Sequence, residues 1–239
     1  MRILGVIPSR YESSRFPGKP LIDLKGKSMI QRVYEQAQKS TLLSDVIVAT
    51  DHDKIYEHVS AFGGQVAMTK KTHQSGTDRC AEILQENPDY DVVINIQGDE
   101  PLIYPEQIDQ LCTLMTEKNA AIGTLIKPFE TLEEIINPNR IKVTINKNGE
   151  ALYFSRSPIP YQPNTTNVSK FWRHIGLYGY QKDTLYDITT LEVSWLEEVE
   201  KLEQLRWLEN GYSIYTAPTS FETPNIDTPE DVKKVLEFL

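Results

Sequence analysis

The stretch DVVINIQ, residues 91–97, decides the fold class because it is apolar at almost every position. A strand that is apolar on both faces is typical of a parallel sheet covered by helices on both sides. The tetrapeptide GDEP, residues 98–101, follows directly and consists of residues that favour turns. Residues 91–97 therefore predict a central strand that ends at a polar turn.

Strand-like and helix-like segments alternate along the first half of the chain. Short apolar runs predict strands at 2–7, 45–50 and 65–69. Segments with helical periodicity follow these runs at 28–39, 53–62 and 76–87. A further helix is expected from about Pro105 to Lys118, with the proline in its first turn. This alternation predicts an α/β fold with a mostly parallel, doubly wound sheet.

The pattern changes after residue 126. The segments at 141–146 and 151–156 flank an Asn148-Gly149 turn and predict a β-hairpin, and residues 173–180 predict another strand. We expect about 127–180 to form a smaller antiparallel excursion within a single domain spanning residues 1–239. The remaining elements are expected to be one long helix over about 195–210, a strand over 212–216 and a helix that starts at Thr228.

Composition limits the classes of function. The chain has 25 Lys and Arg residues against 34 Asp and Glu residues, and its net charge of −9 argues against broad nucleic-acid binding. The apolar runs are far shorter than the roughly 20 residues that cross a bilayer, and the first residues do not predict a signal peptide. Cys80 and Cys112 lack the CxxC spacing of a metal site, so neither zinc nor a disulfide framework is expected. These features predict a protein of the reducing cytoplasm, without membrane or nucleic-acid partners.

The loop PSRYESSRFPGKP, residues 8–20, follows the first predicted strand. In open α/β sheets, ligands bind beyond the carboxyl ends of the strands. The loop brings three cations and three small residues to that edge, namely Arg10, Arg15, Lys19, Ser13, Ser14 and Gly18. Such a loop can bind phosphate through charge and backbone N–H groups, although a solvated basic loop is an equally open reading. The loop contains neither a Walker A motif nor a GxGxxG motif.

Two aspartates are candidate metal ligands. Asp99 lies just past residues 91–97, on the same sheet edge as the basic loop if the strands are parallel. A carboxylate beside phosphate-binding cations predicts a divalent metal such as Mg²⁺, and the alternative is a turn residue. In IDTPED, residues 226–231, Thr228 and the residues after it explain a helix start, so capping does not require Asp227. Asp227 is therefore a candidate for a second metal ligand, although a structural role is favoured when it is taken alone.

Three further groups have two readings each. Ser75 and Gly76 lie at a predicted helix start, which suits either an anion or base site or an ordinary N-cap. His174 lies in a strand of alternating character and is either a site residue or a buried, hydrogen-bonded histidine. Glu203 and Gln204 belong either to a site or to the solvated face of an amphipathic helix.

Nine stretches in the order of a known family extend from one end of the chain to the other. They are IPSRYESSRFPGKPL, VATD, HQSGTDR, NIQGDEP, NPNRIKV, ALYFSRSPIP, RHIGLYGY, LEQLRWLENG and IDTPED. With them the chain closely resembles the CMP-Kdo synthetases, the 3-deoxy-manno-octulosonate (Kdo) cytidylyltransferases of lipopolysaccharide assembly. The opening loop alone would indicate no more than a sugar nucleotidyltransferase. The departures are Ser9 where many relatives have Ala, NIDTPED in place of the more usual GVDTPED, and a short connection at 158–170 that bears on the shape of the sugar pocket.

The resemblance implies a fold, two substrates and a set of site residues. The fold is a Rossmann-like, three-layer nucleotidyltransferase domain whose β-rich excursion forms a homodimer. The substrates are CTP and Kdo, Mg²⁺ is the cofactor, and the catalytic residues are Arg10, Arg15, Lys19, Asp99 and Asp227, with Asp99 and Asp227 as the metal ligands. The nucleotide would contact Ser9, Arg10, Ser13, Arg15, Lys19, Ser75, Gly76 and Gln97. The sugar acid would contact Arg79, Gln97, Arg156, His174, Tyr178, Glu203 and Gln204.

The implied reaction forms CMP-Kdo and pyrophosphate. The anomeric 2-hydroxyl of Kdo attacks the α-phosphorus of CTP and pyrophosphate leaves in line, so positioning and charge neutralisation are the main demands. One alternative is the same reaction on 8-amino-Kdo or another 2-keto sugar acid. A remote alternative is a non-catalytic nucleotide-sugar sensor, which the presence of both Asp99 and Asp227 disfavours.

Overall fold

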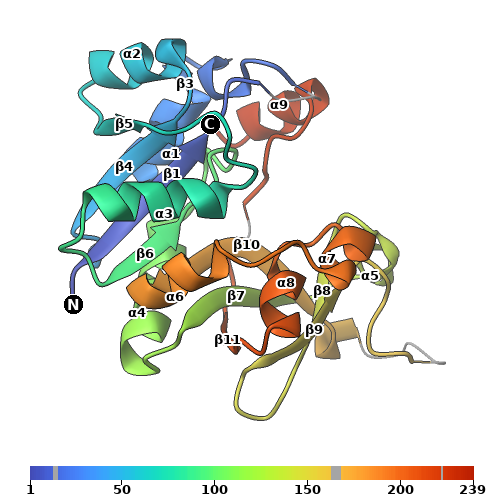
Figure 1. Cartoon of the computed structure of the whole chain (residues 1–239). Coiled ribbons are helices and arrows are strands. Elements are labelled where there is room, and N and C mark those ends of the chain that lie inside the picture. Colours follow the sequence, from blue (N-terminus) through green and yellow to red (C-terminus); the bar gives the residue numbers. More distant parts are fainter. Residues whose placement is uncertain (13–15, 163–167, 222) are drawn as a thin grey trace.

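The sheet at the centre of the molecule contains nine strands (Figure 1). The structure is a computed structural model that describes residues 1–12, 16–162, 168–221 and 223–239. The main strand order is β11-β7-β10-β6-β1-β4-β5. These strands are β11 (Ile214–Pro218), β7 (Ile122–Pro128), β10 (Trp172–Gln181), β6 (Val92–Asn95), β1 (Ile3–Ser9), β4 (Asp45–Thr50) and β5 (Val66–Met68).

The predicted parallel core is confirmed. Strand β1 pairs in parallel with β4 and β6, and β4 pairs in parallel with β5. Strand β10 lies antiparallel between β6 and β7, and β11 returns parallel to β7. The carboxyl ends of β1 and β6 therefore reach the same edge of the sheet, as the sequence analysis requires for the candidate site.

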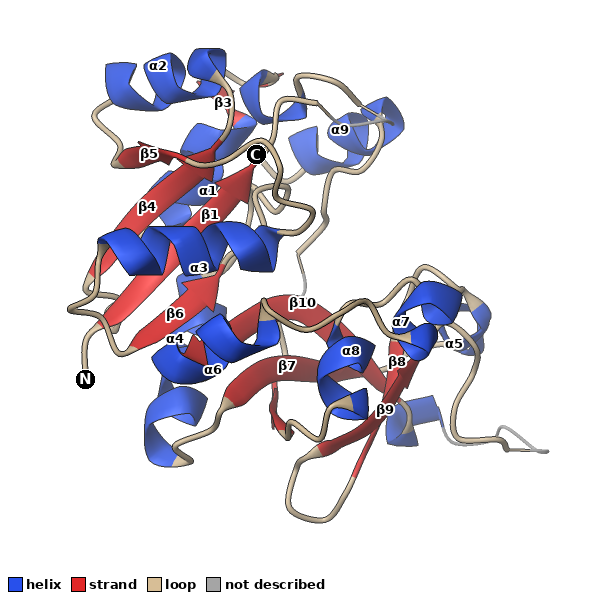
Figure 2. Cartoon of the chain, in the orientation of Figure 1, coloured by secondary structure: helices blue, strands red, loops and turns tan. Residues whose placement is uncertain are grey.

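Helices cover both faces of the sheet and complete three layers (Figure 2). One core joins Ile3 and Ile7 of β1 to three helices, α1 (Met29–Ala37), α2 (Asp53–Ala61) and α4 (Pro105–Glu117). The other core joins Leu4 and Val6 of the same strand to α3 (Gly76–Glu86), α6 (Lys182–Ile188) and α8 (Gln204–Glu209). Because alternate residues of β1 enter different cores, both of its faces are apolar, which explains the continuous hydrophobic pattern of such strands.

The predicted hairpin is confirmed, but it belongs to the main sheet. Strand β8 (Lys142–Ile145) pairs with β9 (Ala151–Ser155) and also with the start of β10, through Trp172 and Arg173. The second half of β10 pairs with β6. The region 127–180 therefore starts as an antiparallel extension and ends in the centre of the sheet. The short elements beside it are α5 (Leu132–Ile136), a 3₁₀ turn at Val168–Lys170 and α7 (Trp195–Glu200).

The prediction of one long helix over 195–210 is wrong. The structure has two helices, α7 and α8, which are separated at Lys201 by a left-handed backbone conformation with φ 54° and ψ 47°. An L-residue adopts this conformation at a cost, and the segment contains no Gly or Pro to reveal the break in the sequence. The break places Glu203 at the start of α8, outside the regular face of a helix.

The last helix, α9 (Pro229–Leu236), begins with Thr228 as its N-cap, as predicted. Two minor strands, β2 (Asp23–Leu24) and β3 (Lys27–Ser28), and a 3₁₀ turn at Lys19–Leu21 lie between β1 and α1. Among the described helices, none has the length and apolar character that crossing a bilayer requires.

Candidate active site

A cavity of about 480 Å³ lies at the carboxyl ends of β1 and β6. Five of the predicted nucleotide or metal residues line it, namely Ser9, Arg10, Lys19, Gln97 and Asp99. The remaining lining residues are Pro8, Glu12, Pro20, Met29 and Gly98. The structure thus brings the basic loop and the QGD turn together, as the parallel arrangement of the strands predicts.

Close backbone approach at Gly98 makes this meeting possible. A Cβ atom at position 98 would lie 2.8 Å from the carbonyl oxygen of Pro8, which is too close for any other residue. On the far side of the turn, the Ile226 N–H donates to the Asp99 carbonyl oxygen at 2.9 Å. This hydrogen bond holds the segment before α9 against the turn and brings Asp227 near Asp99.

The Lys19 ammonium lies between the two candidate metal ligands. Its Nζ is 2.9 Å from Asp99 Oδ2, 3.9 Å from Asp227 Oδ1 and 2.7 Å from the carbonyl oxygen of Ile226. The lysine side chain is only 14% exposed, whereas the side chains of Asp99 and Asp227 are 27% and 38% exposed. The two carboxylates therefore face one shared cation position, which the Lys19 ammonium occupies.

Capping of α9 does not use the Asp227 carboxylate. The side chain of Asp231 accepts hydrogen bonds from the backbone N–H groups of Asp227 and Thr228, at 3.2 and 3.0 Å. The carboxylate of Asp227 instead accepts a hydrogen bond from Asn225 Nδ2 at 2.8 Å and faces Lys19. The structure agrees with the expectation that Asp227 is surplus to the helix start.

The Asp99 and Asp227 carboxylates could supply part of the coordination shell of a magnesium ion. Mg²⁺ is commonly bound by one or two carboxylates together with phosphate oxygens and water. Within the described ranges, no group of three or more His, Cys, Asp or Glu side chains is arranged to hold a metal ion. Asp99 and Asp227 thus fit Mg²⁺ only with additional oxygen ligands, which a nucleotide triphosphate supplies.

Glu100 is a half-buried carboxyl that the sequence pattern did not single out. Burial and the neighbouring Asp99 raise the pKa of Glu100 to about 7. Thr223 Oγ1 donates a hydrogen bond to it at 3.1 Å. The contact ties the QGD turn to the segment that leads to Asp227. In the sequence, the only signal for Glu100 was that it directly follows another acidic residue, Asp99.

The start of α3 lies beside the same cavity. Ser75 is its N-cap, and Ser75 and Asp78 form a reciprocal capping box with two 3.1 Å hydrogen bonds. A Cβ atom at Gly76 would lie 3.3 Å from Pro8 Cγ, so the helix start packs directly against the end of β1. Ser75 is therefore an ordinary N-cap, and the packing of Gly76 against Pro8 puts this helix start next to a residue that lines the cavity.

Four of the predicted sugar-binding residues gather in the core on the α3 side of the sheet. His174 and Tyr178 on β10 have ring centroids 5.2 Å apart, and Tyr178 packs edge-on against Trp207 of α8, also at 5.2 Å. Glu203 and Gln204 lie at the start of α8, where Gln204 is buried. The buried hydroxyl of Tyr178 has no hydrogen-bond partner in the part of the chain that the structure describes, which leaves a polar group for a ligand to satisfy.

The Glu203 carboxylate is held by α3. Thr77 Oγ1 donates to Glu203 Oε2 at 3.0 Å, and Ser75 also hydrogen-bonds to this carboxylate. Burial raises the pKa of Glu203 above its usual value despite these hydrogen bonds. Keeping a carboxylate desolvated costs free energy, and at a functional site the binding of a ligand can offset this cost.

Two predicted sugar ligands are engaged in contacts within the protein. Arg79 is 1% exposed, and its guanidinium donates to Asp51 Oδ2 at 2.6 Å and to Thr69 Oγ1 at 2.5 Å. Arg156 donates through Nε to the carbonyl oxygen of Glu200 at 2.7 Å. Both arginines hold loops together, and a contact of either with the sugar stays a prediction. Ser13 and Arg15 lie outside the described residues.

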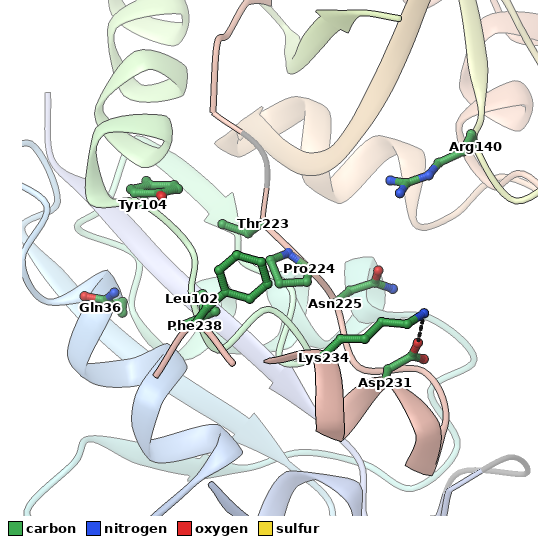
Figure 3. Close-up of a pocket in the computed structure, with 10 residues that line it drawn as sticks. All are labelled: Gln36, Leu102, Tyr104, Arg140, Thr223, Pro224, Asn225, Asp231, Lys234 and Phe238. Atoms are coloured by element: carbon green, nitrogen blue, oxygen red, sulfur yellow. Dashed lines mark ion pairs between the residues drawn. The ribbon is translucent and has the colours of Figure 1, made fainter. Parts of the chain in front are cut away.

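A second cavity of about 550 Å³ contains none of the predicted site residues (Figure 3). It is lined by residues of α1, the start of α4, the 223–225 segment and α9, together with Arg140, which lies apart from the others in this view. Lys234 and Asp231 form an ion pair there at 3.6 Å. The chemistry predicted from the sequence therefore belongs to the smaller cavity at the ends of β1 and β6.

Comparisons with known proteins agree with this geometry. A cytidylyltransferase family model matches residues 4–214. A 3-deoxy-manno-octulosonate cytidylyltransferase of Parabacteroides distasonis is 53% identical, over 100% of this chain and 98% of the relative. One of Cytophaga hutchinsonii is 51% identical, over 98% of this chain and 96% of the relative.

Solved structures show the same similarity. The structure of a CMP:2-keto-3-deoxy-manno-octonic acid synthetase complexed with CTP has a TM-score of 0.94 and 41% identity, and the similarity covers 100% of this chain and 98% of that one. A 4-diphosphocytidyl-2C-methyl-D-erythritol synthase of Anaerococcus prevotii has a TM-score of 0.67 and 12% identity, covering 99% of this chain and 98% of that one. The second similarity is one of fold.

The burial of Glu203 predicts a pH-dependent gain in stability for Glu203→Gln. Because the pKa of Glu203 is higher in the folded chain than in the unfolded chain, ionisation opposes folding, and this cost appears as the pH rises above the ordinary value of 4.5. Glutamine keeps an acceptor for Thr77 without the buried charge. We expect the substitution to raise the free energy of unfolding at about pH 8, and the gain to shrink towards about pH 4.

Chemical denaturation at the two pH values measures this difference. Glu86→Gln, which changes an exposed carboxylate on α3, is the matched control. An equal effect of Glu203→Gln at both pH values, or a loss of stability at the higher one, would contradict the prediction.

Proposed function

The chain belongs to the 3-deoxy-manno-octulosonate cytidylyltransferase family of nucleotidyltransferases, and on that premise we propose that it converts CTP and Kdo into CMP-Kdo and pyrophosphate for lipopolysaccharide synthesis. The observation that carries the proposal is the convergence of Lys19, Asp99 and Asp227 at the carboxyl ends of β1 and β6. One cation and two carboxylates at that edge are what a metal-assisted reaction at a triphosphate requires.

The proposed reaction is a single displacement at phosphorus. The anomeric 2-hydroxyl oxygen of Kdo forms a bond to the α-phosphorus, the bond to the bridging oxygen of pyrophosphate breaks, and the hydroxyl proton passes to solvent. The two cysteines do not provide a nucleophile, since burial raises the pKa of Cys112 to about 12 and also raises that of Cys80. The reaction therefore depends on positioning and on neutralising charge.

Asp99 and Asp227 would hold Mg²⁺ together with phosphate oxygens of CTP. The ion would supply charge neutralisation at the phosphates and lower the pKa of the attacking hydroxyl. Lys19 pairs with both carboxylates, and its ammonium would be available to the phosphates of CTP if Asp99 and Asp227 held Mg²⁺. With Arg10 at the same cavity, it would pair with negative charge that develops on pyrophosphate.

The remaining contacts divide between the two sides of the site. Ser9 and Gln97 line the cavity with Lys19, and Ser75 and Gly76 lie at the start of α3, where the cytosine base would bind. The resemblance adds Ser13 and Arg15 to the nucleotide contacts. The sugar acid would bind at the core that contains His174, Tyr178, Glu203 and Gln204. Further candidates for contact with the sugar are Arg79 and Arg156.

Exposed apolar side chains support the proposal that the β-rich region forms a homodimer. Within 127–180, four large apolar side chains are 49–89% exposed, namely Leu132, Ile136, Leu152 and Tyr161. Val193, Trp195 and Val199, which follow this region in the chain, are 58–69% exposed. Figure 1 shows α5, α7 and the β8–β9 hairpin at the same end of the molecule. Exposed large apolar side chains that gather at one end of a molecule are candidates for an interaction site. A cytoplasmic location completes the proposal, because nucleoside triphosphates are made there, and cell fractionation would check it.

The first prediction concerns the substrate. Purified protein with Mg²⁺ and CTP should release pyrophosphate with Kdo in preference to 8-amino-Kdo and N-acetylneuraminic acid. Preference for 8-amino-Kdo would keep the reaction and change the sugar. Measurable CTP binding without pyrophosphate release in the presence of any of the three sugars would contradict the enzymatic function and favour a non-catalytic nucleotide-sugar sensor.

The second prediction concerns the charged groups. Lys19→Ala and Arg15→Ala should each lower kcat by about 10²–10³, the usual cost of removing one donor to developing negative charge. Asp99→Asn and Asp227→Asn should abolish nearly all activity and weaken Mg²⁺ binding in the presence of CTP, measured by titration calorimetry. Lys27→Ala removes an exposed lysine that pairs with Glu35 and is the matched control. Near wild-type rates in both cation variants, or retained activity in either aspartate variant, would remove those residues from the proposed roles.

The third prediction concerns the dimer. The wild-type chain should sediment as a dimer at micromolar concentration, and Leu152→Asp on β9 should shift it towards monomer because a charge would replace a side chain that is 60% exposed and apolar. Phe238→Asp changes a side chain that is 70% exposed beyond α9, outside the β-rich region, and should leave the dimer intact. A monomeric wild-type protein would refute the proposal.

A further inference from the structure

Strand β10 contains an irregularity opposite Thr124 of β7. Ile175 pairs with Leu125 and Tyr178 pairs with Thr124, so Gly176 and Leu177 are additional residues on β10. Such bulges redirect side chains and are frequent beside active sites. Here the bulge lies between the two aromatic residues of the proposed sugar site, His174 and Tyr178.

The hydroxyl of Thr124 is fully buried inside this bulge. Its Oγ1 lies 2.8 Å from the carbonyl oxygen of Leu177, 3.0 Å from that of Ile175 and 3.2 Å from Nε2 of His174. A hydroxyl has one proton to donate, and a carbonyl oxygen can only accept. The proton of Thr124 must therefore point to the carbonyl oxygens, because otherwise three oxygen atoms would face one another without a hydrogen between them.

This arrangement determines which nitrogen of His174 carries a proton. With its own proton directed to the carbonyls, Thr124 Oγ1 can only accept from the imidazole, so Nε2 of His174 must carry hydrogen. Burial and the neighbouring Arg173 lower the pKa of His174 to about 3, so the ring is neutral near pH 7 and carries one N–H. Nδ1 is then an unprotonated acceptor.

Nδ1 of His174 makes no hydrogen bond within the described part of the chain, and the residue is half-buried. The ring is fixed by Phe154, edge-on at 5.2 Å, and by Tyr178 at the same centroid distance. A Cβ atom at Gly176 would lie 3.9 Å from Gln97 Cγ, so the bulge is close to the QGD turn. A fixed acceptor two residues along the strand from this close approach is suited to a hydroxyl donor of a ligand.

We propose that Thr124 is a positioning residue that holds His174 as the Nε2-protonated tautomer. Nδ1 of His174 then accepts a hydrogen bond from a hydroxyl group of the sugar acid, a contact that rests on the proposed function. His174 then selects a hydroxyl donor and does not act as a cation for the sugar carboxylate. The proposal assigns the sugar carboxylate to other groups and gives the β10 bulge a function.

Nitrogen-15 NMR of the ligand-free protein tests the tautomer without relying on activity. The chain has four histidines, and His174→Gln identifies the imidazole signals of His174 by their loss. The wild type should show a neutral, Nε2-protonated ring near pH 7 whose Nε2 proton exchanges slowly with water. Thr124→Ser should preserve that signal, whereas Thr124→Val should lose the protection from exchange and admit the other tautomer.

Steady-state kinetics test the contact with the sugar. Thr124→Val should raise the KM for Kdo about tenfold, the effect of one lost hydrogen bond, with the KM for CTP unchanged, and Thr124→Ser should restore it. Thr216→Val is the matched control, since Thr216 is the directly opposite residue on β11 and its hydroxyl bonds to Gly149 without contacting His174. This control should leave both KM values and the NMR signal unchanged.

The outcomes separate the inference from the function on which it rests. A wild-type ring that is protonated on Nδ1 or charged near pH 7 overturns the proposal, as does an unchanged, protected Nε2 proton in Thr124→Val. A changed tautomer with an unchanged KM for Kdo overturns the sugar contact. If the wild type does not use Kdo, the proposed function fails while the NMR result still decides the role of Thr124.

Discussion

The Lys19 ammonium between Asp99 and Asp227 is the interaction on which the rest of the site depends. It joins the segment of Lys19 to two others, through the Asp99 carboxylate, 80 residues away along the chain, and the Ile226 carbonyl, 207 residues away. Two carboxylates that share a position without a cation would repel each other, so the lysine keeps the ligand-free site in one arrangement. The parallel register of β1 and β6, the absence of a side chain at Gly98 and the backbone bond from Ile226 to Asp99 all serve this convergence.

The two substrates would then meet at one edge of the sheet from different directions. The cavity at the ends of β1 and β6 is lined by polar and charged groups suited to a triphosphate, whereas His174, Tyr178 and Glu203 lie in the aromatic core under α3 and α8. Packing alone does not explain two features of that core, which are the desolvated Glu203 carboxylate and the buried Tyr178 hydroxyl, for which the described residues offer no hydrogen-bond partner. Such departures from good local chemistry are expected where a ligand supplies the missing interactions.

The sequence predicted the parallel core well because strands such as 45–50 and 91–97 are apolar on both faces, and this pattern follows directly from burial between two layers of helices. It also placed the basic loop and Asp99 on one edge, since strand direction alone decides that. The break at Lys201 was missed because a left-handed residue without Gly has no local signal, and the break is what exposes Glu203 to α3. The bulge at Gly176 and the contacts of Thr124 were not predictable, because they depend on the register between β7 and β10. These two strands are far apart in the sequence, and no local pattern determines their register.

Lys19 occupies the cation position between the two aspartates, and we propose that it would leave this position if Asp99 and Asp227 held a metal ion together with the nucleotide. A crystal structure with CTP and Mn²⁺, without sugar, tests this most directly because Mn²⁺ is located by its anomalous signal. We predict a single peak in contact with both Asp99 and Asp227, with the Lys19 ammonium moved to a phosphate oxygen. A lysine that stays bonded to Asp99, with the metal held by the phosphates alone, would contradict this proposal.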